Sequence, residues 1–126
     1  MEVIKVSGPS QLRRRKQFEA SEKETRVALL ETMIKDLDNM IANLGGQIAA
    51  EEDRTKIKDT SHPAYSMFAV AAAKRRQNLL ISVAHTKSML DVAERELAEV
   101  RAQLLDLEPI HDIQSSRTTE AISGAR

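Results

Sequence analysis

Apolar side chains recur at alternating steps of three and four residues in two separate stretches of the chain. Such steps keep them on one side of a helix, as the seam of a heptad repeat, whereas a half-buried strand would show steps of two. The pattern therefore predicts an all-α chain with two long coiled-coil helices. One seam comprises Val27, Leu30, Ile34, Leu37, Ile41, Leu44 and Ile48, and the other comprises Leu79, Val83, Thr86, Leu90, Ala93, Leu97, Val100, Leu104 and Leu107.

Capping residues and prolines divide the chain around these two seams. Ser10 follows Pro9 and is a candidate N-cap for the first helix. The run Asp59-Thr60-Ser61-His62-Pro63 predicts a turn at residues 59–63, with Pro63 in the first turn of the second helix. Pro109 ends the second proline-free stretch. We expect residues 1–10 and 109–126 to be flexible tails, the second one polar.

A connection this short makes the two helices antiparallel neighbours. Folding back also covers a seam that a single helix would leave in water. Each Å² of apolar surface removed from water in this way stabilises the fold by roughly 25 cal/mol. We therefore predict a long antiparallel two-helix coiled-coil hairpin over residues 11–108. The pairs expected across its seam are Ile48 with Ala72, Ile41 with Leu79, and Val27 with Ala93.

Two places in the seam depart from a regular heptad. Gly45-Gly46 lies inside the first helix, where each glycine costs about 1 kcal/mol relative to alanine. The pair is either a tolerated soft spot where the helices approach closely, or a bend point. In the second helix the seam, extended back towards the turn, passes through Tyr65, Ala69, Ala72 and Arg76.

Several large apolar residues fall outside the seam. Met67, Phe68 and Val70 either pack around the turn or contact a partner, because a two-helix hairpin has no third layer to bury them. A stripe of Ile81, His85 and Val92 lies opposite the second seam, and Leu29, Met33 and Met40 flank the first. These residues either widen the apolar face for self-association or form a docking surface for a different protein.

The composition excludes several classes of protein. One Tyr, two Phe and no Trp are poor material for a globular core, and the absence of Cys removes disulfides and thiol chemistry. Nineteen basic and nineteen acidic side chains cancel, so the overall charge gives no reason to expect nucleic acid or an acidic membrane as partner. The N-terminus lacks the apolar region of a secretory signal, and no apolar run approaches the roughly 20 residues of a membrane span. We expect a cytoplasmic protein.

Candidate chemistry is sparse. His62, His85 and His111 lie on different segments without neighbouring ligands, so we expect no metal and no cofactor. Adjacent carboxylates on a two-helix hairpin have no dry pocket to tune their pKa values, so we expect no catalysis and no nucleotide hydrolysis by the purified chain. Two basic clusters, at residues 13–16 and 74–76, suit a solvated helix face or an acidic protein groove, and no aromatics accompany them for stacking on bases.

One stretch around the turn carries a family resemblance. It runs from Ile48 to Asp59 (IAAEEDRTKIKD), continues through His62-Pro63-Ala64-Tyr65 and the alanine-rich residues 69–73, and ends at Arg75-Arg76-Gln77-Asn78-Leu79. With this stretch the sequence resembles the flagellar export protein FliJ family over about residues 11–108. It departs from the family in an extension before Ser10 and in a short tail after Pro109, where family members usually continue a charged helix.

The resemblance implies a stalk component of the flagellar type III export apparatus. Such a stalk binds and promotes the ring of the export ATPase FliI, contacts the export gate protein FlhA, and is linked to export chaperones. It is cytoplasmic and associates with the inner-membrane export gate only through these partners. The residues that we expect to bind partners are Met67, Phe68, Val70, Arg75, Arg76, Asn78, Ile81 and His85, and those of the turn are Asp59, His62, Pro63 and Tyr65.

Two other functions remain open from the sequence. One is a generic coiled-coil adaptor or scaffold unrelated to export, and the other is a small nucleic-acid binder with a basic tip. The role of Arg76 is open as well, since it can pair with Glu51 or Glu52 inside the hairpin, or join Arg75 in a patch that docks on a partner.

Overall fold

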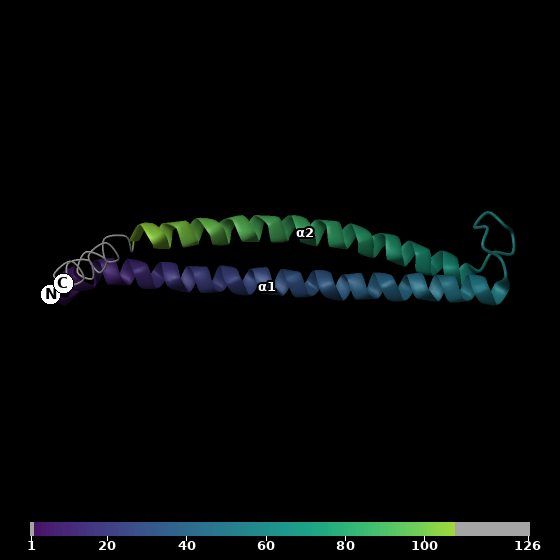
Figure 1. Ribbon diagram of the computed structural model, residues 1–126, viewed down its shortest axis with the longest axis horizontal. Coiled ribbons are helices and arrows are strands. Elements are labelled where there is room, and N and C mark those ends of the chain that lie inside the picture. The colour runs from purple at the N-terminus through teal and green to yellow at the C-terminus, as the bar shows by residue number, and fades with distance from the viewer. Residues whose placement is uncertain (1, 108–126) are drawn as a thin grey trace, which may run out of the picture. The chain divides into compact units, whose positions relative to one another are not determined.

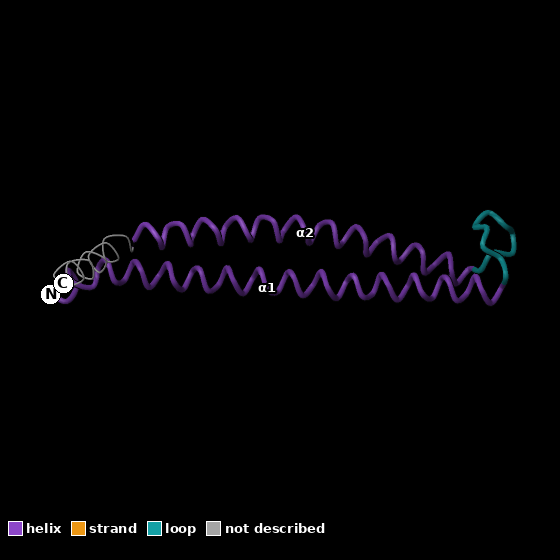
Figure 2. The backbone as a smooth tube through the Cα atoms, in the orientation of Figure 1, coloured by secondary structure: helices purple, strands orange, loops and turns teal. Residues whose placement is uncertain are grey.

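The computed structural model describes residues 2–107, with side chains from Gly8 onward. Two helices, α1 (Glu2–Thr55) and α2 (Met67–Leu107), are joined by a loop and pack against each other as an antiparallel pair (Figures 1 and 2). No strand occurs among the described residues. The predicted all-α hairpin is therefore confirmed. Contacts divide it into two compact units: one spans Val27–Val92, and the other combines α1 up to Arg26 with α2 from Ala93.

The unit that holds the loop, Val27–Val92, buries the predicted seam. Leu30 of α1 and Val83 of α2 are buried, as are Ala69 and Ala72 nearer the loop. The remaining seam positions of α1, from Ile34 to Ile48, are partly buried, as a two-layer structure requires. Thr86 is a buried polar residue in this seam. Its hydroxyl donates a hydrogen bond of 2.8 Å to the Ser82 carbonyl one turn earlier, so its burial leaves no unpaired donor.

The other unit has the same construction. Ala20 of α1 lies buried with Ala93, Leu97 and Val100 of α2. Two ion pairs cross between the helices, from Lys23 to Glu96 at 2.6 Å and from Arg101 to Glu24 at 3.2 Å. The predicted register places position 23 opposite position 97 and position 24 opposite position 96, so the Lys23–Glu96 pair lies one residue from it and the Arg101–Glu24 pair five residues from it.

The start of α1 differs from the prediction. The helix begins at Glu2 and contains Pro9, so the expected N-cap at Ser10 was wrong. A proline inside a helix removes one hydrogen bond and usually clashes with the residue before it. Here that residue is Gly8, which has no Cβ to clash, and its surroundings are open within 4 Å. The dihedral angle that proline fixes is itself helical, so the helix can continue through it.

The glycine pair of α1 lies where a side chain of α2 approaches. Neither Gly45 nor Gly46 has a positive φ, and α1 runs through both. A Cβ at Gly45 would meet Nη1 of Arg76 at 3.7 Å, whereas nothing lies within 4 Å at Gly46. The pair therefore lies inside a continuous helix, and a Cβ at Gly45 would make only an ordinary van der Waals contact with the end of the Arg76 side chain.

Hydropathy of the helices bears on membrane insertion. Neither α1 nor α2, as far as their residues are described, has a stretch apolar enough to cross a bilayer. The second tail, at residues 109–126, lies outside the described residues.

Replacing Leu97 by Asp tests the seam. Leu97 is 7% exposed, and an unpaired carboxylate there should destabilise the hairpin by about 3 kcal/mol or more. Helicity and melting temperature, followed by circular dichroism, should both fall sharply. The matched control is Leu105→Asp, because Leu105 lies on the same helix and is 66% exposed. Equal effects of the two substitutions would show that the seam does not hold the helices together.

Candidate protein-binding surface

Helix α1 ends at Thr55 because the next residue leaves helical geometry. Lys56 has a φ of 62°, the left-handed conformation that commonly terminates helices. The Thr55 hydroxyl donates to the Glu51 carbonyl at 3.0 Å and accepts a hydrogen bond from the backbone N–H of Ile57 at 3.4 Å. These bonds satisfy backbone groups that the helix end would otherwise leave without partners.

The loop from Lys56 to Ser66 contains two successive turns. The Asp59 carboxylate accepts hydrogen bonds from the N–H of Ser61 at 3.0 Å and from its hydroxyl at 2.7 Å. Two backbone hydrogen bonds close the turns. The His62 N–H donates to the Asp59 carbonyl at 3.1 Å, and the Tyr65 N–H donates to the His62 carbonyl at 3.0 Å. The His62 ring also accepts a bond from the Ala64 N–H at 2.9 Å. The hydrogen bonds from Ser61 lower the pKa of Asp59.

The predicted turn residues Asp59, His62, Pro63 and Tyr65 therefore all lie in this loop, but the loop is longer than predicted. The first helix ends at Thr55, and Pro63 lies before the second helix. The expectation that Pro63 occupies its first turn was wrong. Side chains of Asp59 and His62 bond the backbone locally, which offers an alternative to helical hydrogen bonds, so α2 begins only after Ser66.

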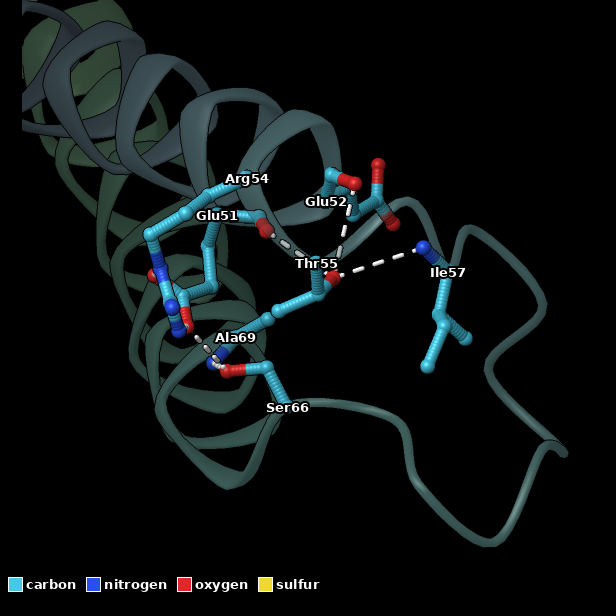
Figure 3. A network of polar contacts seen from close by, with 7 residues as sticks. All are labelled: Glu51, Glu52, Arg54, Thr55, Ile57, Ser66 and Ala69. Carbon is cyan, nitrogen blue, oxygen red and sulfur yellow. Dashed lines mark hydrogen bonds and ion pairs between the residues drawn. The ribbon is translucent and has the colours of Figure 1, made fainter.

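Ser66 links the start of α2 to the end of α1 (Figure 3). Its hydroxyl accepts a bond from the Ala69 N–H at 3.2 Å, as an N-cap, and donates to a carboxylate oxygen of Glu51 at 2.9 Å. Arg54 holds the same carboxylate at 2.6 Å through Nη2 and 3.3 Å through Nε. The hydrogen bonds from Arg54, and then from Ser66, lower the pKa of Glu51.

Tyr65 makes a second link of this kind. It is buried, and its hydroxyl donates to Glu52 at 2.8 Å. This hydrogen bond and the burial of the ring raise the pKa of Tyr65. Glu51 thus bonds Arg54 and Ser66, and Glu52 bonds Tyr65. Within the described part of the chain neither carboxylate pairs with Arg76, so the hypothesis of an internal Arg76–Glu pair was wrong.

The residues expected to bind partners are all exposed on α2. Met67 is 78% exposed, Phe68 55% and Ile81 61%, so the alternative of Phe68 packing around the turn was wrong. The polar members of the set share this exposure. They are Arg75, Arg76, Asn78 and His85.

The helix distributes these residues over more than one face. With Ala69, Ala72, Leu79 and Val83 in the seam, the heptad places Met67 and Ile81 directly opposite it. Phe68, Arg75, Asn78 and His85 fall on one flank of α2, whereas Val70 falls on the other. Val92 lies on the flank of His85, so the expected stripe opposite the seam was wrong for these two residues and right for Ile81. Arg76 points along the seam towards Gly45. The predicted set is therefore divided between the outer face, the flank of Phe68, the opposite flank, which carries Val70, and the seam position of Arg76.

Some contributors to this region were absent from the sequence prediction. Ser66 caps α2 but was not predicted to do so, although a serine directly before a long proline-free run is a recognised signal for a helix start. Leu80 is a further exposed apolar side chain. The roles of Glu51 and Glu52 carried no sequence signal, because their partners follow them by 15 and 13 residues through an irregular loop.

No group of three or more potential metal ligands occurs among residues 2–107. Comparisons with protein-family models, with curated proteins and with solved structures found no match to this chain. The site offers apolar and cationic side chains on a helix whose seam is already covered by α1.

Ser66→Ala should lower the free energy of unfolding by about 1 kcal/mol, because it removes the N-cap of α2 and a hydrogen bond to Glu51. Urea denaturation followed by circular dichroism measures the change. Ser82→Ala is the control, since that hydroxyl is exposed in mid-helix and bonds only a carbonyl of its own helix. A stability of Ser66→Ala equal to that of the wild type would contradict the capping role.

Acid should destabilise the hairpin. The pKa values of Glu51 and Glu96 are lowered by hydrogen bonds, chiefly from Arg54 and Lys23 respectively, below their ordinary value of 4.5. The unfolded chain then binds protons first as the pH falls, so the stabilisation is complete above pH 4.5 and is lost as the pH falls through the lowered values. Melting temperature measured against pH should decline below that point. In the Glu51→Gln/Glu96→Gln variant the decline should be shallower, and an identical decline would assign it to other groups.

Proposed function

We propose that this chain is a FliJ-like stalk component of the flagellar type III export apparatus, which binds the export ATPase FliI and contacts the export gate protein FlhA. Export chaperones are further partners of such a stalk. In this role the chain works in the cytoplasm, beside the inner-membrane gate, and acts by binding rather than by catalysis.

One observation carries the proposal. The motif Arg75-Arg76-Gln77-Asn78, which belongs to the stretch resembling the family, lies on α2 shortly after the loop, and all four of its side chains are exposed. The hairpin does not need them for its own cohesion, because Ala69, Ala72 and the rest of the seam are buried against α1.

The composition of the surface around this motif supports docking on a protein. Met67 and Ile81 supply apolar contacts on the outer face, and Phe68 lies on the same flank as Arg75. Aromatic and apolar anchors beside arginine are typical of the residues that dominate binding energy at protein interfaces. Arginine also suits acidic grooves, because its guanidinium binds carboxylates with two parallel hydrogen bonds.

The test is the double variant Arg75→Ala/Arg76→Ala. Affinity for FliI or for the cytoplasmic part of FlhA, measured by titration calorimetry, should fall about tenfold or more, equivalent to 1.4 kcal/mol. Circular dichroism should change little, since both side chains are exposed.

The matched control is Lys35→Ala/Lys87→Ala, which removes the same charge from exposed positions of the same unit. It should bind nearly as well as the wild type. Full affinity of the well-folded arginine variant for both proteins would refute docking through this motif. Absence of binding by the wild-type chain would refute the export role itself.

A further inference from the structure

Three adjacent cations on α2 have no counter-charge in the part of the hairpin where they lie. Lys74, Arg75 and Arg76 are exposed, and none of them forms an ion pair with a residue that the structure describes. From residue 67 to residue 90, α2 itself carries no acidic side chain. Neighbouring like charges repel one another, so the three cations do not stabilise the hairpin.

The facing part of α1 supplies no counter-charge either. The guanidinium of Arg76 lies near Gly45, and Ser66 bonds Glu51 at 2.9 Å, so this part of α1 runs beside the start of α2. Residues 39–50 of α1 include no charged side chain. The Glu51 carboxylate, which follows them, is already bonded by Ser66 and by an arginine of its own helix. The three cations are therefore open to carboxylates from outside the chain.

Exposed apolar side chains lie on both sides of the three cations along α2. They are between 41% and 78% exposed, and they are Met67, Phe68 and Val70 before the cations and Leu80 and Ile81 after them. The two groups are about 12 residues apart, which is roughly 18 Å along a helix. Lys74, Gln77 and Asn78 lie between them, so the apolar surface is divided into two parts by polar side chains.

The order apolar, basic, apolar indicates the chemistry of a partner. Carboxylates opposite the cations would form charge-assisted hydrogen bonds, and apolar side chains at either end would remove Met67 and Ile81 from water. A lipid surface fits less well. Lys74 occupies the heptad position directly opposite the seam, so the two apolar groups could not both enter the acyl layer without it. Nucleic acid would bind the cations through its phosphates but would leave the apolar groups without contacts.

The backbone of α2 determines which secondary structure the partner adopts. Peptide groups in the middle of a helix bond one another, so α2 offers no free N–H or C=O to an extended strand. A helix satisfies its own backbone groups and can lay one amphipathic side on α2. The surface therefore suits a third helix rather than a strand.

We propose that residues 67–81 bind an acidic amphipathic helix of another protein. Its carboxylates lie opposite Lys74 and Arg75, and its apolar side chains lie opposite Met67 and Ile81. The inference rests on the proposed function for the place of the site, and it adds the kind of segment that occupies the site.

A pair of synthetic peptides tests the proposal on the full chain without any other protein. The probe is a helical peptide of about 20 residues, roughly 30 Å long, with two pairs of leucines about three turns apart on one side and glutamates between them. In the matched peptide every glutamate is a glutamine. Fluorescence anisotropy should show the glutamate peptide to bind at least about tenfold more tightly at about 50 mM salt. The difference should shrink at about 500 mM, because salt screens exposed charges.

Charge reversal assigns the binding to the three cations. Lys74→Glu/Arg75→Glu should weaken binding of the glutamate peptide at least about tenfold, because it places like charges opposite one another. The matched control is Lys35→Glu/Lys87→Glu, which makes the same change of charge at exposed positions of the same unit. The control should bind nearly as the wild type does, and circular dichroism should show both variants to be folded.

Truncation of the apolar groups assigns the ends of the site. Met67→Ser/Ile81→Ser should also weaken binding about tenfold, because the peptide leucines lose their contacts. The matched control is Leu29→Ser/Leu105→Ser, since these side chains are 57% and 66% exposed outside the site. It should leave the affinity nearly unchanged.

The outcomes separate this inference from the export role. Equal affinity for the two peptides, or full affinity of the charge-reversed chain, would overturn the acidic helix even where FliI or FlhA binds. Absence of binding to FliI and FlhA, with the peptide results as expected, would refute the export role and support the site for another protein. Tighter binding of single-stranded DNA or of phosphatidylglycerol vesicles than of the glutamate peptide, lost on charge reversal, would overturn the choice of a protein helix.

Discussion

Burial of one apolar seam between two antiparallel helices is the constraint on which the rest of this structure depends. Long helices with apolar side chains on one side are marginal in water unless that side is covered. In each of the two compact units the cover comes from the other helix, through residues such as Leu30 and Val83 in one unit and Leu97 and Val100 in the other. The ion pairs Lys23–Glu96 and Arg101–Glu24 join the two helices beside this seam. They form where apolar burial already holds the helices together.

A two-layer construction covers each helix on one side only. Every other face stays in solvent, so it is free to carry residues selected for binding. This is why Met67, Phe68 and Ile81 can be exposed while their neighbours Ala69 and Ala72 are buried.

The loop between the helices is ordered by polar contacts rather than by a core. Glu51 and Glu52, at the end of α1, accept hydrogen bonds from Ser66 and Tyr65, at the start of α2. Because Ser66 also caps α2, the direction in which that helix starts is tied to the carboxylates of α1. The start of α2 is therefore held in a defined position relative to the end of α1. A rigid support of this kind suits a docking surface on the residues that follow.

The sequence by itself determined the helices, the seam and the antiparallel pairing, because heptad spacing leaves one way to bury the apolar residues of each helix. It also determined which residues stay outside the seam, including Arg75, Asn78 and His85. Other features depended on contacts that no local pattern encodes. The hydroxyl of Ser66, which caps α2, also bonds the carboxylate of Glu51, 15 residues earlier in the chain. Arg76 occupies a seam position with its guanidinium near Gly45, a residue distant in sequence. Such outcomes belong to tertiary structure, since each depends on which atoms the fold brings within a few ångströms.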